Sequence, residues 1–319
     1  MKRSTKILCA IAGCLMGAGL LLLSAGFFAG GLHSLKAGAL NLPSQGEGVQ
    51  DSFLFQQVDA LSIQCEIGDL SIQMDPDLPA GAVYVEYHLP AGAQASAQME
   101  GATLSFTSRA PRQSLQGLFQ RLLGNLLSQG GLDAYPDANI QLYVSPHGVL
   151  STAHIQLDVG DLAIDGLLCD DLDIHTAVGA AALSKLYAAS SAVVQLDTGS
   201  LSGDALLLNT AQLSCDVGSI DLRDLRCYGL EAVANVGNIR VQGRLAGDNR
   251  FQCDLGSLTL QTTLPISDYD LDLQADMGQV MVDGADCGHN FRQQHANPAH
   301  VIQAVCDLGS MELSGPAEG

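Results

Sequence analysis

Four copies of one short motif supply the side chains best suited to chemistry in this sequence. The motif, Cys-(Asp/Glu)-x-Gly-(Ser/Asp), begins at Cys65, Cys215, Cys253 and Cys306. A thiol beside a carboxylate could serve as a nucleophile or as a metal ligand. The same motif could instead be a structural repeat in which the cysteine is buried. The spacing of the copies decides between these two interpretations.

The glycine of the motif recurs at nearly constant intervals of 19, 20, 19, 19, 19 and 22 residues: Gly160, Gly179, Gly199, Gly218, Gly237, Gly256 and Gly278. Gly68 and Gly309 have the same surroundings outside the even spacing, which predicts an insertion of 12 residues before the last copy and a larger one after the first. Apolar residues fall five, three and one positions before each glycine, and two and four after it. This period of two predicts two short strands per copy, each with one buried face.

A unit of about 19 residues is too short for two strands and a crossover helix. The sequence therefore predicts an all-β fold, a right-handed parallel β-solenoid of about nine turns, in which equivalent residues of adjacent turns lie ~4.8 Å apart in columns. An internal repeat, and not a reactive site, explains the motif. The nine glycines are its structural repeat positions, and we predict no catalytic residues.

The cysteines occupy two of these columns. The four motif cysteines lie three residues before a glycine, where we expect them to point inward as small apolar fillers. A second set lies nine residues after a glycine: Cys169, Cys227 and Cys287. Members of one column lie two or three turns apart, ~10 to 14 Å, beyond the ~7 Å that a disulfide spans. We therefore expect no disulfide within a column, while pairs between the columns stay open.

An acidic residue stands two positions before most of the glycines: Glu66, Asp158, Asp197, Asp216, Asp254, Asp276 and Asp307. We expect this row to face solvent. Stacked carboxylates repel, and a divalent ion such as calcium could relieve the repulsion, so Asp197, Asp216, Asp254 and Asp276 are weak metal candidates. The alternative that we favour is that each carboxylate accepts backbone N–H groups at its own glycine turn. The sequence predicts no cofactor.

The late insertion contains a second group of possible metal ligands: His289, His295 and His300 near Asp286 and Cys287. Zinc accepts such ligands, but no helix or tight knuckle orders them here. We expect an ordinary polar loop.

The N-terminal segment predicts a membrane anchor. Residues 7–32 contain no charge and follow Lys2, Arg3 and Lys6, which predicts a single-pass helix with a cytoplasmic N-terminus and an extracytoplasmic body at the cell membrane. The alternatives are cleavage near residues 37–39 and lipidation of Cys14. The apolar run continues well past Cys14, which favours the anchor.

These patterns predict four segments: a cytoplasmic tip and anchor (1–36), a linker (37–52), the solenoid (53–315) and a tail (316–319). Within the solenoid, an insertion at about 111–135 places leucines at helical intervals after Ser114, which predicts an amphipathic helix. Packing on the solenoid is the burial that we favour for its apolar stripe, and docking to a membrane or partner is the alternative.

The net charge of the chain restricts the kinds of molecule that it can bind. The chain has 14 basic and 34 acidic residues, and four of the basic residues precede position 37, so the remainder carries 10 − 34 = −24. Such a body repels phosphate backbones, which excludes nucleic acid as a partner. Its few cations form no recognisable catalytic set with the abundant outward acids, and the sequence has no tryptophan, so we do not expect an enzyme that acts on polysaccharide.

The stretches "DALSIQCEIGDLSIQM" (59–74) and "NIQLYVSP" (139–146), followed by "VGDLAIDG", "VGSIDL" and "VGNIRVQG", resemble a bacterial family of unknown function called putative adhesins, with β-strand repeats. The resemblance covers roughly residues 53–315. It implies a β-solenoid on the outer side of the cell membrane, in some members associated with envelope-stress systems, and no established catalytic residues. The sequence thus predicts a non-catalytic, adhesin-like scaffold whose partner is a wall polymer, a surface ligand or a membrane protein. The alternative is a sensing module that acts on a membrane partner.

Overall fold

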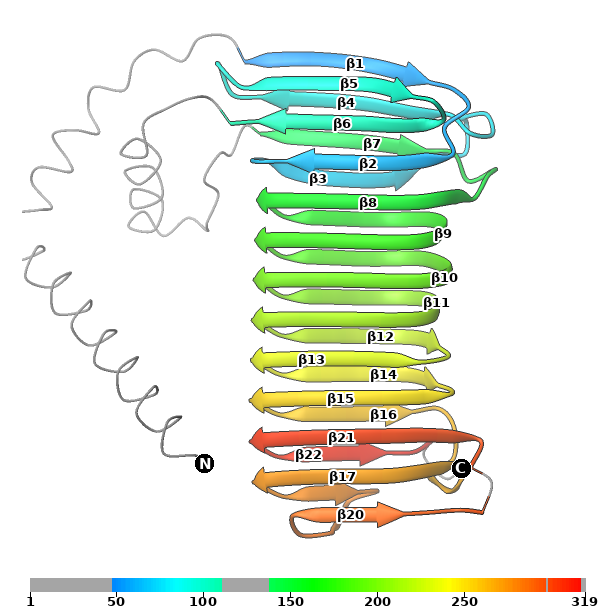
Figure 1. Cartoon of the computed structure of the whole chain (residues 1–319), viewed down its shortest axis with the longest axis vertical. Helices are drawn as coiled ribbons and strands as arrows, with labels where there is room; N and C mark the ends of the chain where they lie inside the picture. The colour runs from blue at the N-terminus through cyan, green and yellow to red at the C-terminus, as the bar shows by residue number, and fades with distance from the viewer. Residues whose placement is uncertain (1–47, 111–137, 297, 317–319) are drawn as a thin grey trace, which may run out of the picture.

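The computed structural model describes residues 48–110, 138–296 and 298–316, which form a stack of two-strand turns (Figure 1). In each turn one strand ends just before a repeat glycine and the next begins just after it. The strands before the glycines pair into one sheet, the pre-glycine sheet, and those after the glycines pair into the opposite, post-glycine sheet. Pairing between successive turns is parallel, as expected for a solenoid. The right-handed sense of the coil stays a prediction.

Three long strands run through both sheets: β9 (Leu162–Val178), β10 (Ala181–Thr198) and β11 (Leu201–Val217). The other strands of the pre-glycine sheet are, in spatial order, β5 (Gln94–Glu100), β6 (Thr103–Arg109), β2 (Ala60–Cys65), β8 (Leu150–Val159), β13 (Leu230–Val236), β15 (Asp248–Leu255), β21 (His300–Leu308), β17 (Tyr269–Met277) and β20 (Asn290–Gln293). Those of the post-glycine sheet are β1 (Val49–Phe55), β4 (Val83–Leu89), β7 (Asn139–Val144), β3 (Asp69–Met74), β12 (Ile220–Cys227), β14 (Ile239–Leu245), β16 (Leu258–Thr262), β22 (Met311–Ser314), β18 (Val280–Val282) and β19 (Ala285–Asp286).

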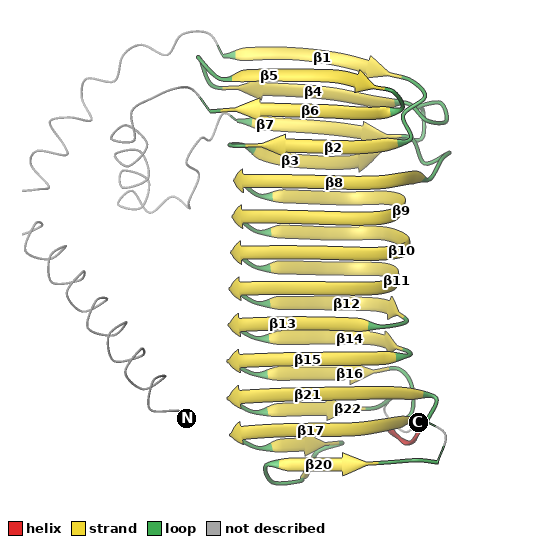
Figure 2. Cartoon of the chain, in the orientation of Figure 1, coloured by secondary structure: helices red, strands yellow, loops and turns green. Residues whose placement is uncertain are grey.

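Helix is confined, in the part of the chain that the structure describes, to one 3₁₀ turn at Ile266–Asp268 (Figure 2). Within the same residues no helix has the length and apolar character needed to cross a membrane. The anchor predicted at 7–32 and the amphipathic helix predicted at 111–135 both lie outside the described residues. The strand β1 begins at Val49, inside the segment 37–52 that the sequence assigned to a linker.

The two sheets enclose one apolar core, and the predicted periodicity is confirmed at four of its five positions. In the turn around Gly218, Leu213, Cys215, Ile220 and Leu222 are all buried. The fifth position, one residue before the glycine, was expected to point inward, and this was wrong. Val217 is 51% exposed, and Asp216 before it is also exposed. The alternation fails here because the register skips Asp216, between Cys215 and Val217, which both pair with the next strand, so two consecutive residues face outward.

The repeat glycines themselves form a continuous column. At Gly199, with φ +147°, a Cβ atom would overlap the carbonyl oxygen of Gly179, and the same overlap with the preceding turn recurs at every later repeat glycine. The Gly179 N–H donates to the carbonyl of Thr198 in the next turn at 2.9 Å. Since the backbones pass too closely for any side chain, only glycine fits this column.

The C-terminal turns do not stack in chain order. β21 pairs in parallel with both β15 and β17, and β22 pairs with both β16 and β18. The last copy of the repeat, around Gly309, therefore lies between the copies around Gly256 and Gly278, as the red strands between yellow and orange show (Figure 1). The expectation of chain order was wrong because β17 and β18 build the outer turn first, and β21 and β22 then fill the turn inside it.

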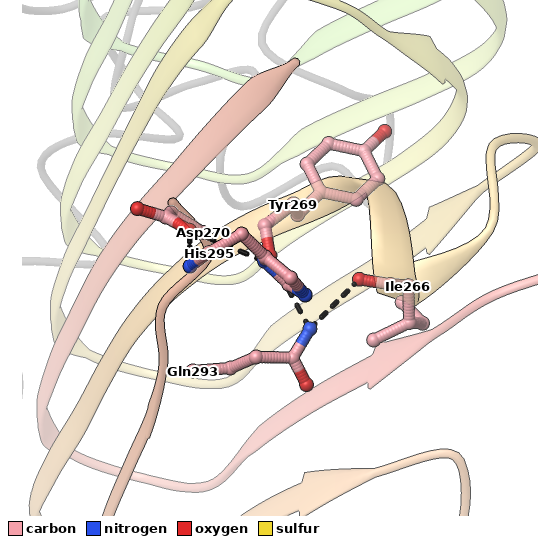
Figure 3. Close-up of polar contacts among 5 residues, drawn as sticks. All are labelled: Ile266, Tyr269, Asp270, Gln293 and His295. Atoms are coloured by element: carbon pink, nitrogen blue, oxygen red, sulfur yellow. Dashed lines mark hydrogen bonds and ion pairs between the residues drawn. The ribbon is translucent and has the colours of Figure 1, made fainter. Parts of the chain in front are cut away.

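The late insertion, expected to be an ordinary polar loop, contains strands that cap this end. β20 runs antiparallel to β17, and β19 antiparallel to β18, which covers the edges of both sheets. Figure 3 shows how the return is fixed: Gln293 Nε2 donates to the carbonyls of Ile266 and Tyr269 at 3.1 and 3.3 Å. The His295 backbone N–H donates to Asp270 Oδ1 at 2.6 Å.

The N-terminal end is also closed by antiparallel strands. β1 and β4 extend the post-glycine sheet beyond β7, and β5 extends the pre-glycine sheet beyond β6. The rings of Tyr87 and Phe106, one from each sheet, meet 5.6 Å apart and close the core at this end. The parallel stack is thus bounded at both ends by antiparallel pairing.

The glycine column makes a direct prediction. Gly218→Ala should abolish folding or reduce the free energy of unfolding by more than about 4 kcal/mol, because its Cβ would overlap the Gly199 carbonyl oxygen. Gly284→Ala is the matched control, since Gly284 also has a positive φ, +76°, but a Cβ added there would meet nothing within 4 Å. It should cost only about 1–2 kcal/mol. Urea unfolding followed by circular dichroism measures both, and equal losses would contradict the overlap.

Candidate functional site

The edge of the solenoid at the repeat glycines carries three parallel rows of side chains. The residues one position before the glycines form the apolar row, in spatial order Val159, Val178, Thr198, Val217, Val236, Leu255, Leu308 and Met277. Those two before form the acidic row: Glu66, Asp158, Ala177, Asp197, Asp216, Asn235, Asp254, Asp307 and Asp276. Those one after form the polar row: Asp69, Asp161, Ala180, Ser200, Ser219, Asn238, Ser257, Ser310 and Gln279.

The polar row holds the corners together. Asp161 Oδ1 accepts the backbone N–H of Ala180 in the next turn at 2.7 Å, and Asn238 Oδ1 accepts that of Ser257 at 2.8 Å. Ser219 Oγ likewise accepts the N–H of Asn238 at 3.1 Å. The acidic row was expected to bond these turn amides, and this was wrong. The residue after the glycine does so because it points along the stack toward the next corner.

The acidic row instead accepts hydrogen bonds mainly from side chains around it. Asp216 Oδ1 accepts from Asn235 Nδ2 at 2.9 Å, and Asp197 Oδ1 lies 3.4 Å from His175 Nε2. Asp254 and Asp276 each accept from the glutamine two residues earlier, at 3.0 and 2.7 Å. Side-chain amide groups on the sheet surface therefore donate hydrogen bonds to these carboxylates.

The four metal candidates do not form one group. Asp197 and Asp216 lie in adjacent turns, but Asn235 separates them from Asp254, and Asp307 lies between Asp254 and Asp276. Among residues 48–110, 138–296 and 298–316, no three His, Cys, Asp or Glu side chains are placed to hold a metal ion. Chain order would place Asp276 between Asp254 and Asp307, because it assigned Asp307 to the last turn of the stack.

Within the acidic row, the stacking of the turns changes the pKa of Asp307 most. Desolvation raises its pKa, and the negative charges of Asp254 and Asp276 raise it further. All three side chains project from neighbouring strands, ~4.8 Å apart. This crowding exists only because β21 inserts between β15 and β17.

The apolar row is the feature of this edge that sequence reasoning missed. Six of its side chains are 40–70% exposed, namely Val178, Val217, Val236, Leu255, Leu308 and Met277. Val159 at one end is half-buried, and Thr198 interrupts the apolar side chains. Monomeric proteins seldom expose a long continuous line of large apolar side chains. The signal was present in the sequence as an apolar residue before every repeat glycine except Gly199, but strict alternation assigned it to the core.

The motif thiols belong to the core. All seven described cysteines are free, and six are buried. Burial raises the pKa values of Cys65, Cys169 and Cys253 to about 12, far from the range of a reactive thiolate. Cys215 Sγ donates to the carbonyl oxygen of Gly199 at 2.9 Å. The interpretation of these cysteines as inward fillers is confirmed.

One consequence of chain-order stacking fails for the cysteines. Cys253 and Cys306 are direct partners in adjacent strands, not members of distant turns. Their α-carbons therefore lie within the ~7 Å that a disulfide requires. The separation that we used to exclude disulfides within a column does not hold for this pair, although both thiols are free in the structure.

The pre-glycine sheet contains one arrangement that looks catalytic. Ser62, His154 and Asp173 are in register on β2, β8 and β9, and His154 Nδ1 lies 3.0 Å from Asp173 Oδ2. The described contacts include no hydrogen bond between His154 and Ser62, and the histidine and aspartate side chains are 43% and 56% exposed. With this open surface and no donor set for an oxyanion, the arrangement is an exposed histidine–aspartate hydrogen bond.

The three histidines of the late insertion go to different places. His295 Nδ1 lies 3.2 Å from Asp270 Oδ1, and His300 Nδ1 accepts the N–H of Gly247. The carbonyl of His289 accepts the N–H of Ala275. They therefore serve the cap and the neighbouring strands separately.

A hollow of about 310 Å³ lies at the corner opposite the glycine edge, near the N-terminal end. Its walls are both polar and apolar, and they include Asp59, Ser145, Val149 and Leu167. None of the residues that the sequence singled out as site candidates lines it.

The negative charges next to Asp307 predict that removal of its carboxylate raises the stability of the protein at neutral pH and not at acidic pH. A group with a raised folded pKa stabilises the protein below its unfolded pKa, and this contribution is lost as pH rises through the folded pKa. Asp307→Asn should therefore raise the Tm slightly at pH 7 and not at pH 3. Asp158→Asn, whose row neighbours are Glu66 and Ala177, should show no such difference. Calorimetry at both pH values tests this, and a loss of Tm in Asp307→Asn at pH 7 would contradict it.

The buried thiols predict alkaline destabilisation. The unfolded Cys169 ionises near 9.0 but the folded one near 12, so its contribution is present below pH 9 and is lost as pH rises toward 12. Cys169→Ala should therefore cost less stability at pH 10.5 than at pH 8. Leu167→Ala, equally buried but not ionisable, should cost the same at both. Urea unfolding measures the loss of stability of each variant at each pH. A cost of Cys169→Ala that is the same at both pH values would contradict the raised pKa of this thiol.

Comparison with known proteins gives fold relatives only. No family model and no curated protein matches the sequence. A crystal structure of a protein described as a putative adhesin from Bacteroides fragilis aligns with 86% of this chain and 100% of its own, at 13% identity and a TM-score of 0.51. A putative cell adhesion protein from Clostridium sporogenes aligns with 84% of this chain and 100% of its own, at 10% identity and a TM-score of 0.31.

A putative lipid binding protein from Parabacteroides distasonis aligns with 86% of this chain and 96% of its own, at 13% identity and a TM-score of 0.33. The Bacteroides fragilis structure supports the resemblance drawn from the repeats: this chain has the fold of a bacterial protein described as a putative adhesin.

Proposed function

We propose that this protein is a non-catalytic, adhesin-like binding scaffold on the outer side of the bacterial cell membrane. The observation that carries the proposal is the apolar row, a line of exposed valine, leucine and methionine side chains along the glycine edge. A repeated row of this kind presents the same contact at ~4.8 Å intervals, which suits an elongated surface ligand.

The rigidity of the edge supports the same role. The polar row bonds successive corners, and the glycine column leaves no space for movement between them. Binding to such a preorganised surface costs little ordering of the protein. The shared fold with the Bacteroides fragilis putative adhesin agrees with a binding role.

The location rests on the sequence. The uncharged run 7–32 after Lys2, Arg3 and Lys6 favours a single-pass anchor with the solenoid outside the membrane. In that arrangement the body needs the membrane for its position but not for contact with its ligand.

The test measures adhesion of the body without its anchor. Bacteria or wall fragments are incubated with a chain that lacks residues 1–36, and capture is compared with that of Val217→Ser/Val236→Ser/Leu255→Ser. We expect the unmodified body to be captured and the triple variant to lose most of this capture, because its apolar contacts are removed without a change of charge. Circular dichroism checks that the variant is folded.

Two results would overturn the proposal. Equal capture of both chains would show that the apolar row does not contribute to binding. Capture of one membrane protein by the full-length chain only, with none by the anchorless body, would replace the adhesin-like role with sensing through a membrane partner.

A further inference from the structure

Four of the eight basic residues that the structure describes gather on two neighbouring strands. Arg223 and Arg226 belong to β12, and Arg240 and Arg244 to β14. All four are exposed on the outer face of the post-glycine sheet, away from the glycine edge. The two strands that carry this arginine patch also carry Asp221 and Asp224, so their net charge is 4 − 2 = +2 in a body of net charge −24. Screening over ~8 Å at physiological ionic strength lets the patch act on a contacting ligand largely apart from distant acids.

The register of the two strands places Arg226 and Arg244 side by side. Arg226 is eight residues after Gly218, and Arg244 is seven residues after Gly237. A shift between Leu222 and Leu225 brings them opposite each other. Gly243 makes this possible, since a Cβ there would overlap the carbonyl oxygen of Leu225. The shift therefore turns both guanidinium groups to the same outer surface.

The two pairs of arginines differ in their partners. Arg223 and Arg240 both approach Asp221, at 3.4 and 3.6 Å. The ion pairs formed among the described residues include none with Arg226 or Arg244. Like charges directly opposite on neighbouring strands destabilise a sheet. An anion bound between them would remove this repulsion.

Apolar and aromatic groups flank the pair. Leu207 precedes Arg226 in the same column and is 47% exposed. Tyr228 follows Arg226 by two residues at the corner and is 64% exposed. An aromatic ring beside arginines provides a flat apolar contact next to charged donors.

We propose that the arginine patch binds an anionic glycan, a polymer of sugar units that carry carboxylate or phosphate groups. The guanidinium groups of Arg226 and Arg244 each donate two hydrogen bonds to one oxyanion of the chain. Tyr228 contacts a sugar ring of the same chain. This binding needs neither the apolar row nor a membrane, so it goes beyond the adhesin-like role and fails independently of it.

The experiment measures binding of the full-length chain in detergent by calorimetry. The probes are polygalacturonate, which carries carboxylates, phosphomannan, which carries phosphates on sugar rings, and neutral dextran. We expect binding to at least one anionic polymer, weakened by added salt, and none to dextran. Preference between the first two probes distinguishes the carboxylate source from the phosphate source. The absence of binding to both would overturn the proposal.

Two variants of equal charge locate the site. Arg226→Gln/Arg244→Gln should weaken binding about tenfold or more, because it removes charge-assisted hydrogen bonds. Arg250→Gln/Arg292→Gln removes the same charge from the pre-glycine sheet and should change the affinity less than about twofold. Equal losses of affinity in the two variants would show that the polymer responds to the total charge of the protein and not to this patch, which would overturn the site. Single-stranded DNA bound as tightly as the glycans would overturn the glycan assignment.

Discussion

The close approach of backbones at the repeat glycines is the constraint on which the rest of this structure depends. At each corner the glycine lies against the glycine carbonyl of the preceding turn, and its N–H bonds the following turn. A side chain at any of these positions would separate two turns and break the pairing of both sheets there. The constraint also explains why the column continues through Gly309 before Gly278: a turn inserted out of order fits only if it brings its own glycine to the same place.

The corner determines what the surface offers. Because the alternation of the strand is interrupted just before the glycine, the two preceding residues face outward together, and an apolar and an acidic row run side by side along the edge. The residue after the glycine points along the stack and accepts the next corner's amide, which keeps the rows in register. A single backbone requirement thus produces both the rigidity of the edge and its chemical pattern.

Much of the fold could be predicted from local spacing, and what could not depends on contacts distant in sequence. The inward positions of Leu213, Cys215, Ile220 and Leu222 follow from alternation within one turn. The place of β21 does not, because 19-residue spacing describes neighbours along the chain and not the order in which turns stack. The pairing of Cys253 with Cys306 and the crowding at Asp307 were missed for that reason. The exposed apolar row was missed for another: alternation holds inside a strand and fails where the strand ends.

The surface features differ in how they arise, and this bears on their function. The apolar row follows the repeat through most of its turns, so it offers a long and uniform contact. The arginine patch occupies only β12 and β14, and it depends on a register shift at a glycine outside the repeat column. A uniform row favours avidity along an extended ligand, whereas a local patch in an acidic body favours recognition of one chemical group. Since the two features lie on different parts of the same stack, the two proposed contacts do not compete for one surface.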